Sequence, residues 1–261
     1  MPFEELKARQ SVVWGSAPWE RLSWLLTPVH EQLATALWTG SRERWLDVGT
    51  GTGALAILAA RRGADVTGVD LAPRLIETAR RLAEADGVDA RFEVGDAEAL
   101  PFGAASFDVV SSAMGLILAP DHGAVARELA RVCRAGGRIG FSAWRPGATF
   151  TPVTSRYAPP PEPGQGDSAD WGREEYVRDL LAESFELRFE EGDAPLTGES
   201  GEAVWQLMLA GAGPFRARAE SLPPDEAARF HREFVDYLEQ HRGADGVHVA
   251  GPYLVVLGTR R

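Results

Sequence analysis

The pattern of hydrophobic and polar positions alternates between two periods from residue 44 to residue 144. Short apolar runs, which are typical of buried strands, alternate with segments in which apolar residues recur at helical spacing and which end at glycine. This pattern predicts strands at 44–49, 64–70, 90–96, 107–113 and 138–144, and helices at 53–62, 73–87 and 123–134. Such an alternation implies a parallel sheet covered on both faces, and therefore an α/β fold.

Outside this region the pattern is less regular. Residues 158–166 form a loop rich in proline and glycine. We expect further helices at 174–183, 201–213 and 224–242, and further strands at 185–190 and 252–258. Before the first strand, residues 3–38 form amphipathic segments that are unusually rich in tryptophan.

Composition and charge exclude several classes of protein. With 261 residues, 44% apolar and 25% charged, the chain is suited to a globular protein with a sizeable core. Its net charge of −11 repels phosphate backbones, so we expect no nucleic-acid partner. Lys7 is the only lysine, which we interpret as the coding bias of a GC-rich genome.

The sequence also bears on cellular location. Its start lacks the basic and apolar regions of an export signal, and its longest apolar stretch, 109–120, is too short to cross a bilayer. Cys133 is the only cysteine and cannot form an internal disulfide, which suits a reducing compartment. We therefore expect a cytoplasmic protein without membrane insertion.

A glycine-rich turn follows the first predicted strand, in the segment Asp47-Val-Gly-Thr-Gly-Thr-Gly53. Glycines there let a ligand lie against the backbone at the carboxyl edge of the sheet. Dinucleotide sites favour the spacing G-x-G-x-x-G, whereas these glycines occupy alternate positions and no Walker-type lysine follows. The acid before the turn disfavours phosphate and favours a ligand that carries an ammonium or sulfonium group.

Two more acids end the next two predicted strands. A carboxylate at Asp70 can accept two hydrogen bonds from a ribose diol. Asp96, with the backbone N–H of Ala97, can recognise the amino group and a ring nitrogen of adenine. Each acid alone could instead cap a helix. Together with Asp47 they describe one nucleoside-shaped site.

These motifs resemble those of class I S-adenosylmethionine-dependent methyltransferases, in the small-molecule group of the ubiquinone and menaquinone methyltransferases (methyltransferase type 11). The matching segments are Leu46-Asp-Val-Gly-Thr-Gly-Thr-Gly53, Val69-Asp70, Gly95-Asp-Ala-Glu-Ala-Leu-Pro-Phe102, Phe107-Asp-Val-Val110 and Arg131-Val-Cys-Arg-Ala-Gly-Gly137. The resemblance implies a Rossmann-like, doubly wound, seven-stranded sheet whose last strand inserts antiparallel between the fifth and the sixth. It implies a single domain over 1–261: an N-terminal helical lid (3–40), a cofactor-binding core (44–144), and an acceptor-side helical insertion with the last two strands (145–261).

The resemblance also implies roles for individual residues toward S-adenosylmethionine. The residues it assigns to the cofactor are Asp47, Gly49, Thr50, Gly51, Gly53, Asp70, Leu71, Asp96, Ala97, Ala113 and Met114. The glycines would lie against the methionine part and Asp47 would hold its amino group, directly or through water. Leu71 would pack on adenine. Ala113 and Met114 would face the sulfonium region, with alanine where the quinone methyltransferases have serine.

The tryptophans allow two interpretations. Trp14 and Trp19 could pack onto the core, as aromatic residues at helical spacing usually do. They could instead form a lid that shields the sulfonium by cation–π contact and walls an apolar acceptor pocket, which Trp144 could join. The second interpretation favours an aromatic or lipid-like acceptor.

The sequence does not identify a catalytic base. His30, His122 and His231 are candidates, but a base is needed only when the acceptor loses a proton during attack. Residues 111–114 lack the Asn/Asp-Pro-Pro-Tyr pattern of enzymes that methylate nucleobases. We expect a small-molecule acceptor, O- or C-methylation, no metal ion, and a monomer or homodimer.

Two other functions stay open at this point. A nicotinamide-dependent dehydrogenase would share the fold, but the glycine spacing and Asp47 argue against it. A methyltransferase-like cyclase or a non-catalytic subunit would share the cofactor motifs, because those motifs report binding rather than turnover.

Overall fold

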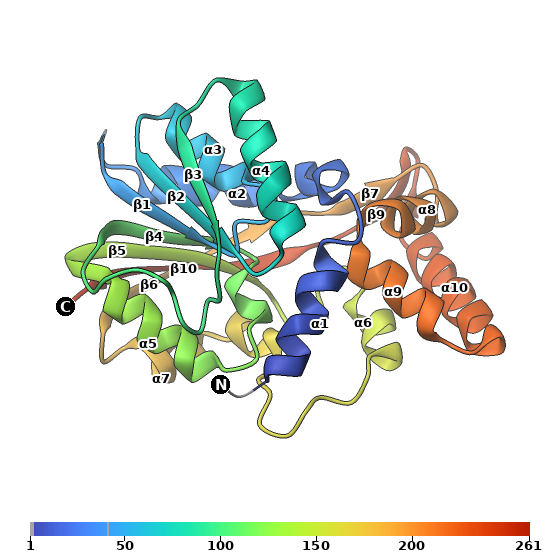
Figure 1. The fold of residues 1–261 in the computed structure, drawn as a ribbon. Coiled ribbons are helices and arrows are strands. Elements are labelled where there is room, and N and C mark those ends of the chain that lie inside the picture. Colours follow the sequence, from blue (N-terminus) through green and yellow to red (C-terminus); the bar gives the residue numbers. More distant parts are fainter. Residues whose placement is uncertain (1–2, 41) are drawn as a thin grey trace.

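The computed structural model describes residues 3–40 and 42–261, which fold around a seven-stranded sheet (Figure 1). Its strands are β1 (Arg44–Val48), β2 (Asp65–Asp70), β3 (Ala90–Val94), β4 (Phe107–Ala113), β5 (Cys133–Trp144), β6 (Phe185–Asp193) and β10 (Pro252–Arg260). They lie in the order β3-β2-β1-β4-β5-β10-β6. The first five are parallel, and β10 is antiparallel to both β5 and β6. The predicted Rossmann-like fold with an inserted antiparallel strand is confirmed.

Helices cover both faces of this sheet. They are α2 (Thr27–Leu37), α3 (Ala54–Arg61), α4 (Pro73–Asp86), α5 (His122–Val132) and α7 (Glu174–Leu181). Figure 1 shows α2, α3 and α4 on one face and α5 and α7 on the other. Their apolar sides pack on fully buried strand residues such as Leu46 and Val255. No helix in the described ranges is long and apolar enough to cross a membrane.

The junction between α5 and β5 differs from the prediction. The helix was expected to reach residue 134 and stop at Gly136-Gly137, but it ends at Val132 and β5 begins at once. Cys133 pairs with Phe107, and a shift of register follows before the next pairs. A Cβ at Gly137 would lie 3.0 Å from the Asp108 carbonyl oxygen. Gly137 therefore serves a close approach of two strands rather than a helix end.

The C-terminal third contains more elements than predicted. It includes α6 (Thr151–Thr154), α8 (Gly201–Gly211), α9 (Gly213–Ser221) and α10 (Pro224–Glu239), together with a small sheet of β7 (Leu196–Gly198), β9 (Gly246–Val249) and β8 (Arg242–Gly243). The prediction missed α9 and this sheet, and it continued the helix at 224–242 into β8. Phe230, Phe234 and Leu238 on α10 are fully buried in a second apolar core.

The N-terminal segment contacts both parts. It contains α1 (Glu4–Trp14) and the 3-10 turns η1 (Trp19–Arg21) and η2 (Ser23–Leu26). Further 3-10 turns are η3 (Leu116–Leu118), η4 (Ser155–Tyr157) and η5 (Ser168–Gly172). In Figure 1, α1 runs between the sheet and α9, and the Arg216 guanidinium of α9 donates to the Ser16 carbonyl. The segment therefore closes the carboxyl side of the sheet.

Candidate cofactor and acceptor site

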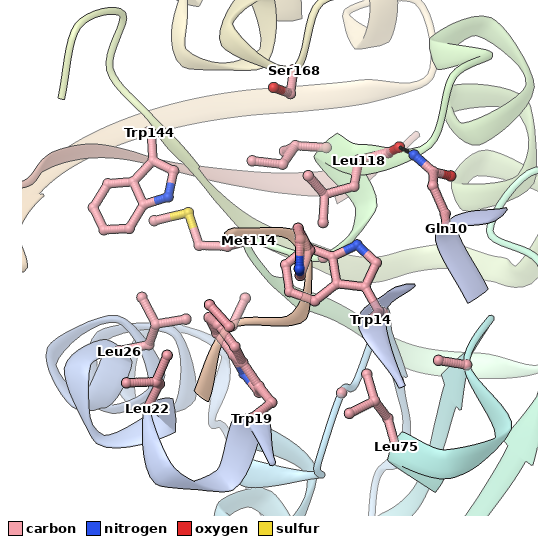
Figure 2. Close-up of a pocket in the computed structure, with 18 of the residues that line it drawn as sticks. Gln10, Trp14, Trp19, Leu22, Leu26, Leu75, Met114, Leu118, Trp144 and Ser168 are labelled. Atoms are coloured by element: carbon pink, nitrogen blue, oxygen red, sulfur yellow. Dashed lines mark hydrogen bonds between the residues drawn. The ribbon is translucent and has the colours of Figure 1, made fainter. Parts of the chain in front are cut away.

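A cavity of about 670 Å³ lies at the carboxyl edge of the sheet, beneath the N-terminal segment (Figure 2). Its lining includes nearly every residue that the sequence assigned to the cofactor: Trp14, Trp19, Asp47, Gly49, Thr50, Gly51, Asp70, Leu71, Asp96, Ala97, Ala113 and Met114. The exception is Gly53, which is buried beside Phe92 and Ala79 outside the lining. The fold thus brings residues from five separate segments to one space.

The glycine turn after β1 has a backbone that only glycine accommodates at Gly49. Its φ is +63°, and a Cβ there would lie 2.7 Å from the Cα of Gly115, in the loop after β4. Gly51 also has a positive φ, of +56°, but a Cβ there would meet only Trp19, at 3.9 Å. The turn is therefore packed on one side and open toward the cavity on the other.

Asp47 is buried beside this turn and holds two hydroxyl groups. Thr50 Oγ1 and Ser111 Oγ each donate to one of its carboxylate oxygens, both at 2.7 Å. Burial raises the pKa of Asp47 to about 6, although the two hydroxyls act in the opposite direction and the Asp70 carboxylate adds to the increase. The pair of hydroxyls fixes a carboxylate that a cationic group would stabilise.

Asp70 is fixed by backbone donors. The Gly51 N–H donates to its Oδ2 at 2.8 Å and the Ala72 N–H to its Oδ1 at 2.9 Å. Burial raises the pKa of this carboxyl. Neither α3 nor α4 has a side-chain cap among the described residues, since Gly53 and Ala72 occupy those positions. The helix-cap interpretation of Asp47 and Asp70 is therefore wrong.

Asp96 forms an ion pair that the sequence interpretation missed. Lys7 Nζ, on α1, lies 2.7 Å from Asp96 Oδ2 and 2.7 Å from Glu98 Oε2. The Lys7 side chain is 6% exposed. Glu98 also accepts the Asp121 N–H at 2.7 Å. The only lysine of the chain thus connects the N-terminal helix to the loop after β3. Lys7 therefore has a structural role that its interpretation as a result of coding bias did not include.

Aromatic and apolar side chains form the rest of the wall. Trp14 and Trp19 stack edge to face with ring centroids 5.5 Å apart. Figure 2 shows both near the cavity, together with Trp144 from β5 and the extended side chain of Met114. Trp144 therefore lines the same cavity as the N-terminal tryptophans, and Trp19 also packs against both apolar cores.

The three candidate histidines differ in their surroundings. His30 lines the cavity, and burial lowers its pKa to about 4, so its imidazole is neutral near pH 7. His122 is outside the lining, with its Nδ1 2.7 Å from the Tyr176 hydroxyl. His231 is paired with Glu202 away from the cavity. Of the three, only His30 lines the cavity.

Comparisons with known proteins agree with this geometry. A family model described as "Methyltransferase domain" matches residues 46–137. An uncharacterized protein of Mycobacterium tuberculosis is 36% identical over 188 residues, which are 69% of this chain and 67% of that protein. A demethylmenaquinone methyltransferase of Thermus thermophilus is 46% identical over 99 residues, 37% of this chain and 45% of that enzyme.

The solved structures extend the agreement in fold to most of the chain. The YcgJ protein of Bacillus subtilis superposes with a TM-score of 0.61 at 19% identity, over 89% of this chain and 97% of that one. The chain belongs to the class I S-adenosylmethionine-dependent methyltransferases, and S-adenosylmethionine is its cofactor. The nicotinamide alternative is thereby set aside.

Proposed function

We propose that this enzyme methylates an oxygen or carbon atom of a small apolar or aromatic metabolite. One observation supports this most: one cavity combines a cofactor side with an apolar side. The cofactor side has the glycine turn and the acids Asp47, Asp70 and Asp96. The apolar side has residues of the C-terminal third, among them Met208, Phe215 and Phe230. The similarity of part of the chain to a demethylmenaquinone methyltransferase is consistent with an acceptor of this kind.

We propose that residues 1–261 work as one domain. Residues 3–40 act as the lid, 44–144 bind the cofactor and 145–261 form the acceptor side. The net charge of −11 and the absence of a nucleobase-methylation pattern support small molecules over nucleic acid. The buried Cys133 fits a cytoplasmic enzyme, which we propose is a monomer or homodimer.

Each cofactor-binding residue has a proposed role. Asp70 accepts hydrogen bonds from the ribose diol, while Leu71 packs on adenine. Asp96 and Ala97 hold the adenine edge, and Asp47 attracts the amino group. Gly49, Thr50, Gly51, Ala113 and Met114 surround the methionine and sulfonium parts, while Trp14 and Trp19 cover them. Gly53 supports the turn from outside the cavity, because its lack of a side chain leaves room for Phe92.

When bound, S-adenosylmethionine supplies an electrophilic methyl group. The chain's own contribution is to align the acceptor and exclude water, effects worth about 7–11 kcal/mol in favourable cases. The neutral imidazole of His30 is available to accept a proton from a hydroxyl acceptor.

Replacing Asp70 by alanine is expected to weaken S-adenosylhomocysteine binding by roughly 1.5–3 kcal/mol, because hydrogen bonds to a charged group are lost. Calorimetric titration measures this change. Asp65→Ala is the matched control, since Asp65 begins the same strand and pairs with Arg91 at the surface. Unchanged affinity in Asp70→Ala would remove the proposed role.

Cofactor affinity is expected to depend on pH through Asp47. Its pKa is about 6 in the free protein, and a bound ammonium group lowers that pKa because it favours the ionised form. Binding therefore releases a proton below pH 6, and affinity falls about ten-fold from pH 7 to pH 5. Asp47→Asn should bind more weakly at pH 7 without this dependence. An identical pH profile in the variant would contradict the role of Asp47.

An acceptor panel tests the reaction itself. Release of S-adenosylhomocysteine would be followed with phenols, naphthols, hydroquinones and isoprenoid alcohols, and with polar amines and oligonucleotides as comparators. We expect turnover with aromatic or apolar acceptors. Turnover confined to the polar amines or the oligonucleotides would contradict the proposed acceptor class.

A further inference from the structure

Arg218 is a basic side chain in an unusual position, on the acceptor side of the cavity. It lies on α9, three residues after Phe215, so the two share one face of the helix. Both line the cavity, and Phe215 is buried. Arg216, two residues before Arg218, is directed elsewhere and donates to the Ser16 carbonyl. The helix therefore presents one arginine to the cavity and the other to the N-terminal segment.

The Arg218 guanidinium has no acidic partner within the described residues. The basic groups around the cavity are Lys7, His30 and Arg218. Lys7 is paired with two carboxylates and His30 is neutral near pH 7. In the part of the chain that the structure describes, no carboxylate lies within ion-pair distance of Arg218 and no acceptor receives a hydrogen bond from its guanidinium. Its five donors are therefore available to a ligand.

Buried apolar side chains line the same cavity as Arg218. They include Met208, Phe215 and Phe230. Burial lowers the pKa of Arg218. The carboxylates of the cavity that lie on the cofactor side are already engaged: Asp47 by two hydroxyls, Asp70 by backbone N–H groups, and Asp96 by Lys7. A guanidinium in such a setting suits an anionic oxygen group, which it holds with two parallel hydrogen bonds.

We propose that Arg218 binds an anionic group of the methyl acceptor, a carboxylate or a phosphate, and so selects an acceptor with an apolar body and one acidic end. This inference rests on the proposed function, because it assigns the C-terminal third of the cavity to the acceptor. The acidic end binds at α9, and the apolar body extends toward Trp144 and Met114, where the methyl group is transferred.

A pair of fluorescent probes tests the proposal without knowledge of the natural acceptor. The probe 8-anilinonaphthalene-1-sulfonate carries an anionic group, whereas N-phenyl-1-naphthylamine has the same aromatic body without it. Both would be titrated against the protein saturated with S-adenosylhomocysteine. We expect the sulfonate to bind the wild type more tightly, and Arg218→Met to weaken it about ten-fold or more while the neutral probe is unaffected.

Matched variants complete the design. Arg218→Lys keeps the charge and should retain part of the preference for the anionic probe. Arg232→Met removes an exposed arginine of α10 outside the cavity lining, so it should change the affinity of neither probe. Displacement of the sulfonate by 1-naphthoate or by 1-naphthyl phosphate distinguishes a carboxylate from a phosphate preference. Equal affinity of the two probes for the wild type, no binding of the sulfonate, or an equal loss of both in Arg218→Met would overturn the proposal.

Failure of this inference differs from failure of the proposed function. A protein that binds S-adenosylhomocysteine normally but shows no preference for the anionic probe loses only the role of Arg218. A protein that fails to bind S-adenosylhomocysteine loses the cofactor site itself. Arg218→Met should leave the affinity for S-adenosylhomocysteine unchanged, which also verifies that the variant is folded.

Discussion

Gly49→Ala is expected to lower the free energy of unfolding by about 2–5 kcal/mol and to abolish measurable cofactor binding. An L-residue at a φ of +63° costs roughly 1–2 kcal/mol, and overpacking typically costs a further ~1–3 kcal/mol. The overpacking is severe because the new Cβ would meet backbone atoms of Gly115, which cannot rotate away. Urea denaturation and calorimetric titration measure the two effects.

Gly51→Ala is the matched control for this prediction. Its φ of +56° imposes similar strain, but the nearest atom to the new Cβ is Trp19 Cδ1 at 3.9 Å. We expect a loss of stability of only about 1–2 kcal/mol. If both variants lost the same stability, the close approach of Gly49 and Gly115 would not be what constrains the turn.

The second large effect is expected for Lys7→Met. Removing one partner from a buried ion pair costs about 3–5 kcal/mol, because the remaining charges stay buried without compensation. Here Glu98 is buried and Asp96 is nearly so, and both accept their bond from the same ammonium group. Cofactor affinity should also fall, because Lys7 fixes the Asp96 loop. Chemical denaturation and titration with S-adenosylhomocysteine test both outcomes.

Arg9→Met serves as the control on the same helix. Arg9 pairs with Glu162, but the two side chains are 59% and 38% exposed, so the pair contributes about 0–1 kcal/mol. A small loss for Arg9→Met and a large one for Lys7→Met would show that α1 is fastened through the loop after β3. Similar small losses for both variants would contradict the structural role of Lys7.

The cofactor half of the site was predictable because its signals are local in the sequence. Asp47 and the glycines lie within one turn, and Asp70 ends a strand whose direction the alternating pattern had already defined. Parallel strands bring their carboxyl ends to one edge of the sheet. The positions of the acids at the ends of these strands were therefore sufficient to predict that they lie in one site. Only Gly53 among these residues proved to support the turn rather than line the cavity.

The contacts that complete the cavity were not predictable, because they join distant segments. Lys7 lies 89 residues from Asp96, and no local pattern relates the two. Arg218 lies on α9, a short helix that the pattern missed and that begins at Gly213, where the preceding helix was predicted to end. The strand β8 has two residues, too few for any periodicity. His30 became distinguishable from His122 and His231 only through burial and position.

Calorimetric titration of the purified protein with S-adenosylmethionine, S-adenosylhomocysteine and NADH tests the central claim most directly. The claim is that the glycine turn, Asp47, Asp70 and Asp96 together hold an adenosyl sulfonium cofactor. We predict micromolar binding of both adenosyl ligands and none of NADH. Absence of binding by both adenosyl ligands, or binding of NADH with equal affinity, would contradict it.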